Sequence, residues 1–463
     1  MKNIFLLLLL FLLPFIHTVS AQTPFVFPEN IKPLIATRWG QGYPFNILTP
    51  KVEGQEEEEI RPLAGCGAVA MAQILYHYRY PAWSPDQKYE YDWHHMYHRL
   101  SNDLQFTQLV SVAKLISDCG VSAFTQYGFD ASSTNLSNMQ NGLKRLYGYS
   151  DYMGLYSRDR FTTPHRDSLF RTMLFNELKA GRPVLYRGEK KDSKGGHLFI
   201  IDGCKGERVH VNMGWAGRRD EYYKLDDLGD FSEHQWMLVG VADTTYHPDI
   251  CSIQLQTAGT LSQQLSDEQL QQTQHIAVSG PINDDDIALL KQMCQTGVLS
   301  TVNLRNASIK TIPDSAFAEC SQLTHIILPT SSIRIAKCAF LFCWNLNRVV
   351  FPDSLLYIHE QAFRGCSNLF SPQLPSSLQT IDQGAFYNCD GMVHAIIPEH
   401  VWKIETDAFS HCKNLISVYL PKTLRQTAQN LVRDCPKLKR FNIDPDNPFF
   451  YIEGTELKEK ETK

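Results

Sequence analysis

The sequence has no excess of positive charge. Lys and Arg total 44 residues against 49 Asp and Glu, which leaves a net charge of −5. A nucleic-acid-binding protein normally needs a basic surface to displace counterions, so this balance argues against a nucleic-acid partner. Low-complexity tracts are also missing, and 43% of the 463 residues are hydrophobic. This composition excludes an intrinsically disordered chain and supplies two or three packed cores.

Long hydrophobic runs are missing after the first residues. Lys2 is followed by an apolar run over 4–16 and by the small residues Val19, Ser20 and Ala21. This pattern predicts a secretory signal peptide over 1–21, cleaved after Ala21. A retained membrane anchor is the weaker alternative, because a spanning helix needs roughly 20 apolar residues. We expect an exported chain, extracellular, at the cell surface or periplasmic, with no membrane span in the mature protein.

Motifs for metals and cofactors are scarce. No C-x-x-C pair and no phosphate-binding glycine loop occurs. His94 and His98 stand four residues apart and could form a metal-binding face, but the aromatic run around them favours packing at a domain surface. We therefore expect no metal and no cofactor. The acidic run Glu56–Glu59 predicts a solvated loop without a specific role. Repulsion of acidic substrates is the alternative role.

A 23-residue repeat fills the C-terminal part of the chain. One such unit cannot bury its own apolar face, whereas stacked units form a solenoid. The pattern resembles BspA-like leucine-rich repeats, which implies a leucine-rich-repeat solenoid over 301–450. We expect a linker and N-terminal cap over 246–300, with a short helix over 284–293, and a frayed charged tail over 451–463. Two of the repeating columns are Phe317, Phe340, Phe363, Phe386 and Phe409, and Cys320, Cys343, Cys366, Cys389, Cys412 and Cys435.

Half of the 12 cysteines lie in that repeat column. An even number of cysteines in an exported chain raises the alternative of disulfides. Equivalent positions on stacked coils, however, project in parallel and lie about 4.8 Å apart or more. A disulfide needs Cβ atoms that converge to about 3.8 Å. We therefore expect buried free thiols.

Residues 22–245 carry no repeat and mix helical with strand patterns. Helices are predicted after Gly65 up to Tyr80, over 111–118 and over 170–179. Strands are predicted over 197–202, 208–213, 221–225 and 236–241, separated by turn residues. Helices followed by an antiparallel sheet predict an α+β domain.

A cysteine, a histidine and an asparagine in this domain have the chemistry of a thiol nucleophile. Cys66 begins a predicted helix, whose N-terminus favours a thiolate. His197 begins the strand over 197–202, and Asn212 ends the next strand. If Cys204 and Lys205 formed a two-residue turn, Asn212 would lie opposite His197 and could hydrogen-bond the imidazole. This is a Cys-His-Asn arrangement in outline.

Five sequence blocks resemble the streptopain family of papain-fold cysteine peptidases. They are WGQGYPFN, GCGAVAMAQILYHYRYP, ELKAGRPVLYRG, GGHLFIIDG and VNMGWAG, between Trp39 and Val241. The resemblance implies a papain-like peptidase domain over 22–245, with Cys66 as nucleophile, His197 as general base and acid, and Asn212 as its orienting group. It also implies that Trp215 lies beside the His/Asn pair. Gln41 is the best candidate for a side-chain oxyanion donor, next to the Cys66 N–H; holding a loop is its alternative role.

Two departures from the family pattern leave alternatives open. Met213 stands where the family usually has Trp after the catalytic Asn, and Trp39 lies 18 residues beyond the expected cleavage point. We expect no family-type propeptide, so the repeat domain or a separate inhibitor bound there would restrain activity. The sequence favours a cysteine endopeptidase acting on proteins or peptides. An adhesin with an inactive peptidase fold, and a transpeptidase or deamidase using the same cysteine, are the alternatives.

The repeats offer an extended surface of the kind that binds proteins. We therefore expect them to hold a protein ligand or to dock the enzyme on a surface. A purely architectural role is the alternative.

Overall fold

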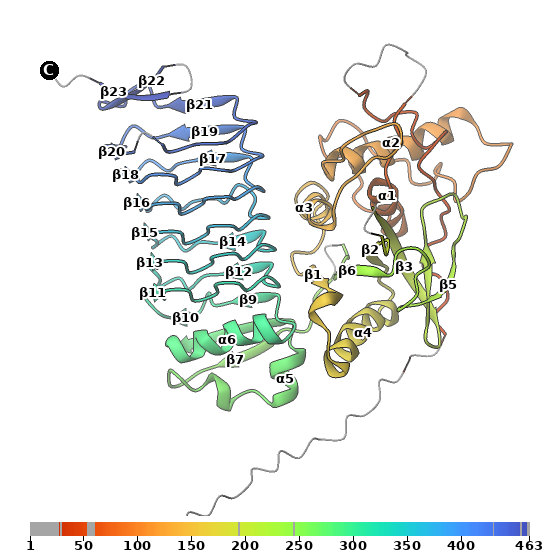
Figure 1. The fold of residues 1–463 in the computed structure, drawn as a ribbon, viewed down its shortest axis with the longest axis horizontal. Coiled ribbons are helices and arrows are strands. Elements are labelled where there is room, and N and C mark those ends of the chain that lie inside the picture. Colours follow the sequence, from red (N-terminus) through yellow and green to blue (C-terminus); the bar gives the residue numbers. More distant parts are fainter. Residues whose placement is uncertain are drawn as a thin grey trace, which may run out of the picture.

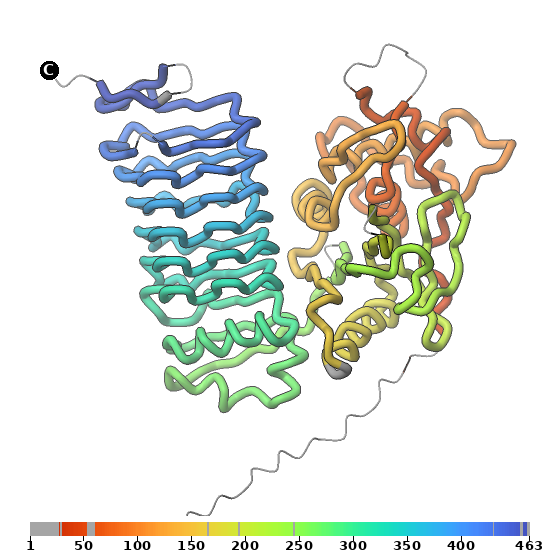
Figure 2. The backbone as a smooth tube through the Cα atoms, viewed as in Figure 1, coloured from red at the N-terminus to blue at the C-terminus, as the bar shows by residue number. Residues whose placement is uncertain are grey.

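The computed structural model describes residues 27, 30–52, 61–192, 195–243, 246–428, 430–453 and 456–460. The expected signal peptide over 1–21 and the acidic run Glu56–Glu59 lie outside these residues. Over the described ranges, no helix has the length and hydrophobicity needed to cross a bilayer. A mixed helix-and-sheet domain lies beside a solenoid of stacked coils (Figure 1, Figure 2).

The N-terminal domain combines helices with one antiparallel sheet, which confirms the α+β prediction. Its sheet has the strand order β1-β6-β2-β3-β4-β5, with every neighbouring pair antiparallel. The helices are α1 (Cys66–Tyr78), α2 (Phe106–Ser122), α3 (Leu136–Leu146) and α4 (Pro164–Lys179), with a 3₁₀ turn η1 (Arg158–Arg160). The strands are β1 (Gly154–Ser157), β2 (Val184–Glu189), β3 (Gly196–Lys205), β4 (Arg208–Asn212), β5 (Glu221–Lys224) and β6 (Glu233–Val239).

Strand β3 is buried on both faces and divides the domain core in two. Leu198 and Ile200 pack into the cluster that contains α1, α2 and α3. Phe199 and Ile201 belong to the opposite cluster, with side chains of α4. This alternation follows from the two-residue period of a strand, and it explains why β3 reads as a continuous apolar run rather than as alternating polarity.

Helix α1 is the central helix of the domain. Every residue from Gly67 to Tyr76 is buried. Its small residues allow this close packing: a Cβ on Gly67 would lie 2.3 Å from Thr134 Cγ2 and 3.0 Å from Leu198 Cδ1. The helix ends where Arg79 adopts a left-handed conformation with φ of 50°.

The C-terminal part is a solenoid of parallel strands, as the repeat predicted. One face carries the strand orders β10-β8-β9-β12-β14, with β7 beside β8, and β17-β19-β21; the other carries β11-β13-β15-β16-β18-β20. The first face is built from β7 (Cys251–Gln254), β8 (His275–Pro281), β9 (Thr301–Asn303), β10 (Ala307–Ser308), β12 (His325–Ile327), β14 (Arg348–Val350), β17 (His394–Ile396), β19 (Ser417–Leu420) and β21 (Arg440–Ile443). The second is built from β11 (Thr311–Ile312), β13 (Arg334–Ile335), β15 (Tyr357–Ile358), β16 (Thr380–Ile381), β18 (Lys403–Ile404) and β20 (Gln426–Thr427).

Short helices cover the first coil of the solenoid (Figure 1). They are η2 (Leu261–Gln263), α5 (Asp267–Gln272) and α6 (Asp284–Thr296). Helix α6 contains the short helix predicted over 284–293. It begins there because the Asn283 side chain accepts hydrogen bonds from the N–H groups of Asp285 and Asp286, which caps the helix.

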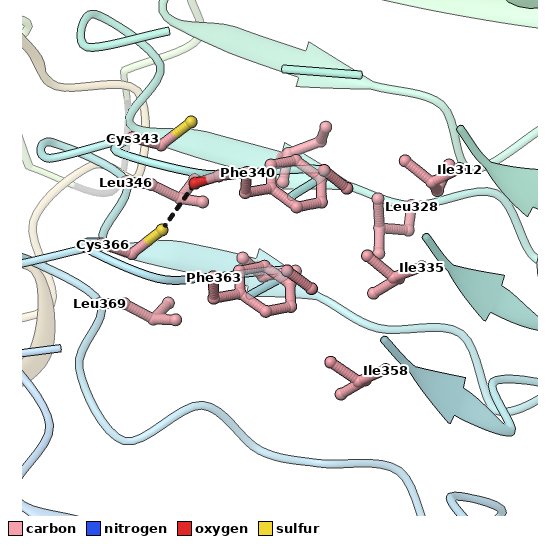
Figure 3. Close-up of a cluster of buried hydrophobic side chains, with 14 of the residues drawn as sticks. Ile312, Leu328, Ile335, Phe340, Cys343, Leu346, Ile358, Phe363, Cys366 and Leu369 are labelled. Carbon is pink, nitrogen blue, oxygen red and sulfur yellow. Dashed lines mark hydrogen bonds between the residues drawn. The ribbon is translucent and has the colours of Figure 1, made fainter. Parts of the chain in front are cut away.

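The repeat columns stack as ladders inside the solenoid (Figure 3). Successive phenylalanine rings from Phe317 to Phe409 lie 5.0 to 5.5 Å apart and within 5° of parallel. Five of the six column thiols donate to phenylalanine carbonyls, as from Cys366 to Phe340 at 3.1 Å, and Cys320 donates to the Lys291 carbonyl. The six column cysteines are free thiols, which confirms the prediction. Each thiol satisfies a buried carbonyl, so the column combines apolar packing with a weak hydrogen bond.

The end of the chain differs from the frayed tail that we expected. Strands β22 (Phe450–Glu453) and β23 (Glu456–Glu459) form an antiparallel hairpin. Asn447 attaches this hairpin to the last coils. Its amide group donates to the carbonyls of Pro421 and Leu424, and its oxygen accepts from the Phe450 N–H at 2.8 Å. The prediction of fraying was wrong here because it rested on charge and ignored the anchoring asparagine.

Helix α3 joins the two parts of the molecule. It lies beside the middle of the solenoid (Figure 1), where its side chains contact Asn347, on the coil that carries β14, and Asn368 and Phe370 on the next coil. Hydrogen bonds between the parts join Ser137 to Asn368 (2.9 Å), Gln140 to Asn347 (3.0 Å) and Tyr156 to the Val298 carbonyl (2.9 Å), and Arg348 pairs with Asp151. Apart from the exposed Arg348, these side chains are buried or half-buried, so the solenoid is docked on the domain rather than tethered by a linker.

Candidate active site

Cys66 occupies the first position of α1. Gly65 precedes it with φ of 92°, a conformation that favours glycine, and lets the chain turn sharply into the helix. The tight packing of Gly67 on Leu198 holds this helix end against β3, one residue from His197. The sequence therefore placed the thiol correctly at a helix N-terminus, and the fold brings that terminus to the start of β3.

Two opposing effects act on the Cys66 thiol. Burial raises its pKa, because a thiolate in an apolar site loses hydration. The backbone N–H groups of Leu198, Gly67 and Cys66 itself, and the positive charge of Arg187, work in the other direction. Burial prevails in this arrangement, so the resting sulfur is a protonated thiol at neutral pH.

The His197 imidazole is enclosed by aromatic rings. Its centroid lies 4.6 Å from that of Trp215 and 5.0 Å from that of Phe231, and the residue is only 5% exposed. Burial therefore lowers the pKa of His197 to about 4. Among the hydrogen bonds of the described residues, none joins His197 to Cys66; the ring bonds to the Met213 carbonyl instead.

That bond defines the tautomer of the imidazole. Nε2 lies 2.8 Å from the Met213 carbonyl oxygen, which can only accept, so Nε2 carries the proton. Nδ1 is then the unprotonated nitrogen of the neutral ring. A neutral imidazole with a free Nδ1 has the electronic state that a general base requires.

The pairing of β3 with β4 differs from the register we expected. Lys205 pairs with Arg208, so the two turn residues are Gly206 and Glu207 rather than Cys204 and Lys205. An irregularity between Ile201 and Gly203 shifts the register again, and Ile200 lies opposite Asn212. The prediction that Asn212 faces His197 was therefore wrong. The main cause is the position of the turn, and the irregularity adds a shift of one residue where Ile31, which hydrogen-bonds Cys204 in both directions, crosses close to Gly203.

Asn212 forms an amide pair with Gln73 of α1. Gln73 Nε2 donates to Asn212 Oδ1 at 3.1 Å, and Asn212 Nδ2 lies 3.4 Å from Gln73 Oε1. Asn212 also donates to the Thr37 carbonyl at 2.9 Å and accepts from the Gly214 N–H at 3.1 Å. The last bond closes a turn around Met213, so Asn212 fixes the peptide whose carbonyl binds His197.

Gln41 lies on a loop whose backbone contacts the segments that carry Cys66 and Trp215. Its carbonyl accepts the N–H of Ala64, two residues before Cys66, at 2.9 Å. Two residues earlier, the Trp39 carbonyl accepts the N–H of Ala216, next to Trp215, at 3.0 Å. Within the part of the chain that the structure describes, the Gln41 side chain has no hydrogen bond, so its amide is free to donate to another group.

Three further residues near the site were not found from the sequence. Asp220 accepts the Met213 N–H at 2.8 Å, and the Arg187 side chain lies along β2 beside Gly196. Gln73 is fully buried in α1. Only Gln73 left a clear signal, since it interrupts the apolar run AVAMAQILY at a position that a helix core would otherwise fill with a hydrophobic residue.

The histidines first considered for a metal lie elsewhere. His94 is exposed, and His98 bonds through its ring to the Tyr76 hydroxyl at 3.1 Å. In the described ranges, no three His, Cys, Asp or Glu side chains gather as metal ligands would.

Comparison with known proteins decides which family this site belongs to. Residues 39–223, which include all five candidate residues, match the Peptidase C10 family. The chain contains a peptidase C10 domain. Residues 292–369 and 333–452 match the BspA type leucine-rich repeat region in six copies. The C10 domain and the repeat domain thus correspond to the two parts of the fold.

Relatives of the C10 domain include two bacterial proteins. Streptopain of Streptococcus pyogenes is 29% identical over 269 residues, which cover 49% of this chain and 66% of streptopain. The thiol protease/hemagglutinin PrtT of Porphyromonas gingivalis is 25% identical over 282 residues, covering 52% of this chain and 31% of PrtT. The chain thus spans just under two thirds of streptopain and about a third of PrtT.

Among solved structures, the active interpain A cysteine protease of Prevotella intermedia is 29% identical. The aligned region covers 48% of this chain and 98% of the interpain A chain, and the TM-score is 0.42.

Proposed function

We propose that the C10 domain, residues 22–245, is a cysteine endopeptidase that cleaves protein substrates. One observation carries the proposal: the Cys66 thiol lies at the N-terminus of a buried helix, among backbone N–H groups, beside strand β3, whose second residue is His197. Helix N-termini of this kind stabilise a thiolate when a substrate needs one. The relatives named streptopain and thiol protease support the same chemistry.

The resting imidazole must turn before it can act. Rotation about its side-chain bonds would carry Nδ1 from the aromatic enclosure of Trp215 and Phe231 toward the Cys66 sulfur. The free Nδ1 then takes the thiol proton, and the resulting thiolate and imidazolium stabilise each other. Substrate binding supplies the reason for the turn, since it adds contacts that the resting state lacks.

The reaction then proceeds through an acyl-enzyme. The Cys66 sulfur attacks the scissile carbonyl carbon, and the oxyanion accepts hydrogen bonds from the Cys66 N–H and the Gln41 amide. His197 gives its proton to the leaving amine as the C–N bond breaks. Neutral His197 next takes a proton from water, whose oxygen attacks the thioester, and the carboxylic acid product leaves as the proton returns to sulfur. This cycle uses no metal and no cofactor.

The remaining candidate residues position His197. Asn212 acts through its neighbour, because its side chain holds the turn that presents the Met213 carbonyl to the imidazole. Trp215 covers one face of the ring and keeps water from it. Met213 itself is fully buried, so the methionine fills core space where the family usually has Trp.

We further propose that the chain is exported by its N-terminal signal and acts outside the cytoplasm. The cap over 246–300 and the repeats over 301–450 would then bring the peptidase to a protein or a surface. Met213 and the unpaired resting thiol favour a second candidate function, a binding protein whose peptidase fold is inactive.

Inhibitor labelling followed by product analysis tests these functions. The full-length protein is incubated with an epoxide inhibitor of cysteine peptidases, and the modified peptide is mapped by mass spectrometry. We expect labelling at Cys66 and loss of casein cleavage, with new α-amino termini in the uninhibited digest. Absence of labelling together with absence of casein cleavage would support the inactive fold, whereas labelling with exchanged or deamidated peptides would support the other acyl-transfer reactions.

The pH dependence of alkylation tests the resting state. Because burial raises the Cys66 pKa, the thiolate fraction without substrate should keep growing above pH 9.0. We expect the iodoacetamide rate at Cys66 to rise with pH through that value, as measured by quantitative mass spectrometry. A rate already maximal at pH 6 would instead indicate a preformed thiolate–imidazolium pair and contradict the resting arrangement.

A further inference from the structure

A recurring backbone hydrogen bond joins successive coils of the repeat domain, and it is missing at one place in the described solenoid. Leu304 donates to Ile327 at 2.8 Å, Leu328 to Val350 at 3.0 Å, and Ile397 to Tyr419 at 3.0 Å, each one coil ahead. The equivalent residues between the second and third of these donors are Phe351 and Leu374. Neither has such a bond in the described solenoid, and no strand pairs with the outer edge of β14.

Pro372 explains the break. It stands 23 residues after Val349, the centre of β14, and 23 before Ala395, the centre of β17. Proline has no N–H to give to a strand, so it is confined to edges and interruptions. Ser371, just before it, has φ of 28°, and its hydroxyl oxygen accepts hydrogen bonds from the N–H groups of Val393 and His394. The coil over 371–374 therefore leaves the sheet, and β14 and β17 become edges.

Arg145 of the C10 domain fills part of the space that this coil leaves. Its guanidinium donates to the carbonyls of Asn347 and Phe370, both at 3.3 Å, and stacks 3.4 Å over the Phe370 ring. On neighbouring coils the matching carbonyl, such as that of Thr324, accepts backbone N–H groups of the next coil. Arg145 of the C10 domain thus makes hydrogen bonds that the backbone of a neighbouring coil makes elsewhere. It keeps the gap between the coils open beside α3.

A cavity of about 540 Å³ lies in this gap. Its walls include the β14 edge, the displaced coil and the end of α3. Arg145 and Arg348 bring two positive charges to it, and the protonated form of Lys144 brings a third, against the carboxylates of Asp151 and Asp353. Arg348 pairs with Asp151, whereas the Lys144 ammonium reaches only the Asp151 carbonyl and the Asn347 side-chain oxygen. With Lys144 protonated, the gap therefore keeps a surplus of positive charge.

We propose that this gap binds an extended acidic peptide segment of a partner protein, which adds a strand along β14. The free β14 edge supplies main-chain hydrogen bonds, and alternate side chains of an added strand point to opposite faces. One set would meet the apolar walls at Phe351 and Leu374. The other set would carry the carboxylates that Lys144 and Arg348 can bind.

Charge complementarity selects this occupant over an apolar or basic peptide. A basic strand would meet like charge at Lys144, Arg145 and Arg348. An uncharged strand would leave the Lys144 ammonium, whose pKa burial lowers to about 7, without a counter-charge. The proposal does not depend on peptidase activity, because none of these residues belongs to the candidate active site.

Fluorescence anisotropy tests the proposal with the full-length Cys66→Ala protein, so that the probe is not cleaved. The probe is a fluorescein-labelled peptide of alternating valine and glutamate, and its matched control replaces glutamate with lysine. We expect saturable binding of the acidic peptide alone, and weakening by raised salt. Absence of binding, or equal binding of the lysine peptide, would overturn the proposal.

Three variants locate the binding site. Arg348→Gln should weaken binding about tenfold, the equivalent of one charge-assisted contact of about 1.4 kcal/mol, while Arg348→Lys should weaken it less. Pro372→Val should also reduce binding, because it restores the N–H with which the coil can rejoin the sheet. Lys439→Gln, at an exposed position on a distant coil, is the charge-matched control and should bind normally. Equal affinity in all four variants would place the peptide elsewhere and refute the assignment, with thermal melts confirming that each variant folds.

Discussion

Replacing Cys66 with alanine is expected to lower casein hydrolysis about 10⁴-fold or more, as the loss of a covalent nucleophile does in other hydrolases. Alanine leaves no atom at this position that can attack a carbonyl. The side chain sits at a helix start that already tolerates small residues, so the fold should persist. Initial rates on casein, compared with the unchanged protein at equal concentration, measure the effect.

Cys338→Ala provides the matched control for this variant. Cys338 is a half-buried free thiol of the repeat domain, far along the chain from the candidate site. Its replacement should leave casein hydrolysis unchanged. If Cys66→Ala kept more than a small fraction of the activity while its circular dichroism spectrum matched the unchanged protein, Cys66 would not be the nucleophile.

Replacing Phe363 with alanine is expected to destabilise the repeat domain by about 3–5 kcal/mol, the usual cost of deleting a fully buried ring. Phe363 is fully buried and stacks between Phe340 at 5.0 Å and Phe386 at 5.3 Å. Removing it leaves a cavity and breaks the ring ladder in the middle. Neighbouring coils cannot close the space, because each is held in register by its own strands.

Guanidinium unfolding, followed by circular dichroism with reductant present, measures this loss. Trp344→Ala is the control, since Trp344 is a larger aromatic residue of the same coils but 56% exposed. Its replacement should cost far less. Equal destabilisation by the two variants would mean that the ring ladder contributes no more than exposed aromatic packing.

Much of the fold follows from periodicity alone. The 23-residue columns predicted the solenoid and the free thiols, because each repeat position must meet its own copy one coil away. Helix α1 was also predictable from the sequence, because small residues stand at its start and an apolar run follows them. Helix α3 was missed, although Leu136, Met139 and Leu143 keep a helical spacing and Asn135 caps it by accepting from the Asn138 N–H. Its polar residues concealed the helix because they face the repeat domain, which sequence reasoning treated as separate.

The sequence predicted which residue types form the candidate site, but it did not predict the hydrogen bonds between them. Chemistry alone singled out Cys66 and His197, since a thiol at a helix start and an imidazole at a strand start are distinctive. The partner of His197 depended on strand register, and the turn between β3 and β4 lies at Gly206 and Glu207 rather than at Cys204 and Lys205. An irregularity near Gly203, where Ile31 crosses the strand, shifts the register by one further residue, and a local pattern cannot report such a contact. The pairing of Gln73 with Asn212 was hidden for the same reason.

The nearly identical spacing of the coils has an evolutionary consequence. A coil touches only the coil before it and the coil after it, so insertion or deletion of one whole 23-residue unit leaves every remaining ladder intact. The coils held by α3 would stay in place while the C-terminal end of the solenoid moved nearer or farther. Descendants of this gene could thus adjust the reach of the molecule in fixed steps, without altering a single residue around the thiol.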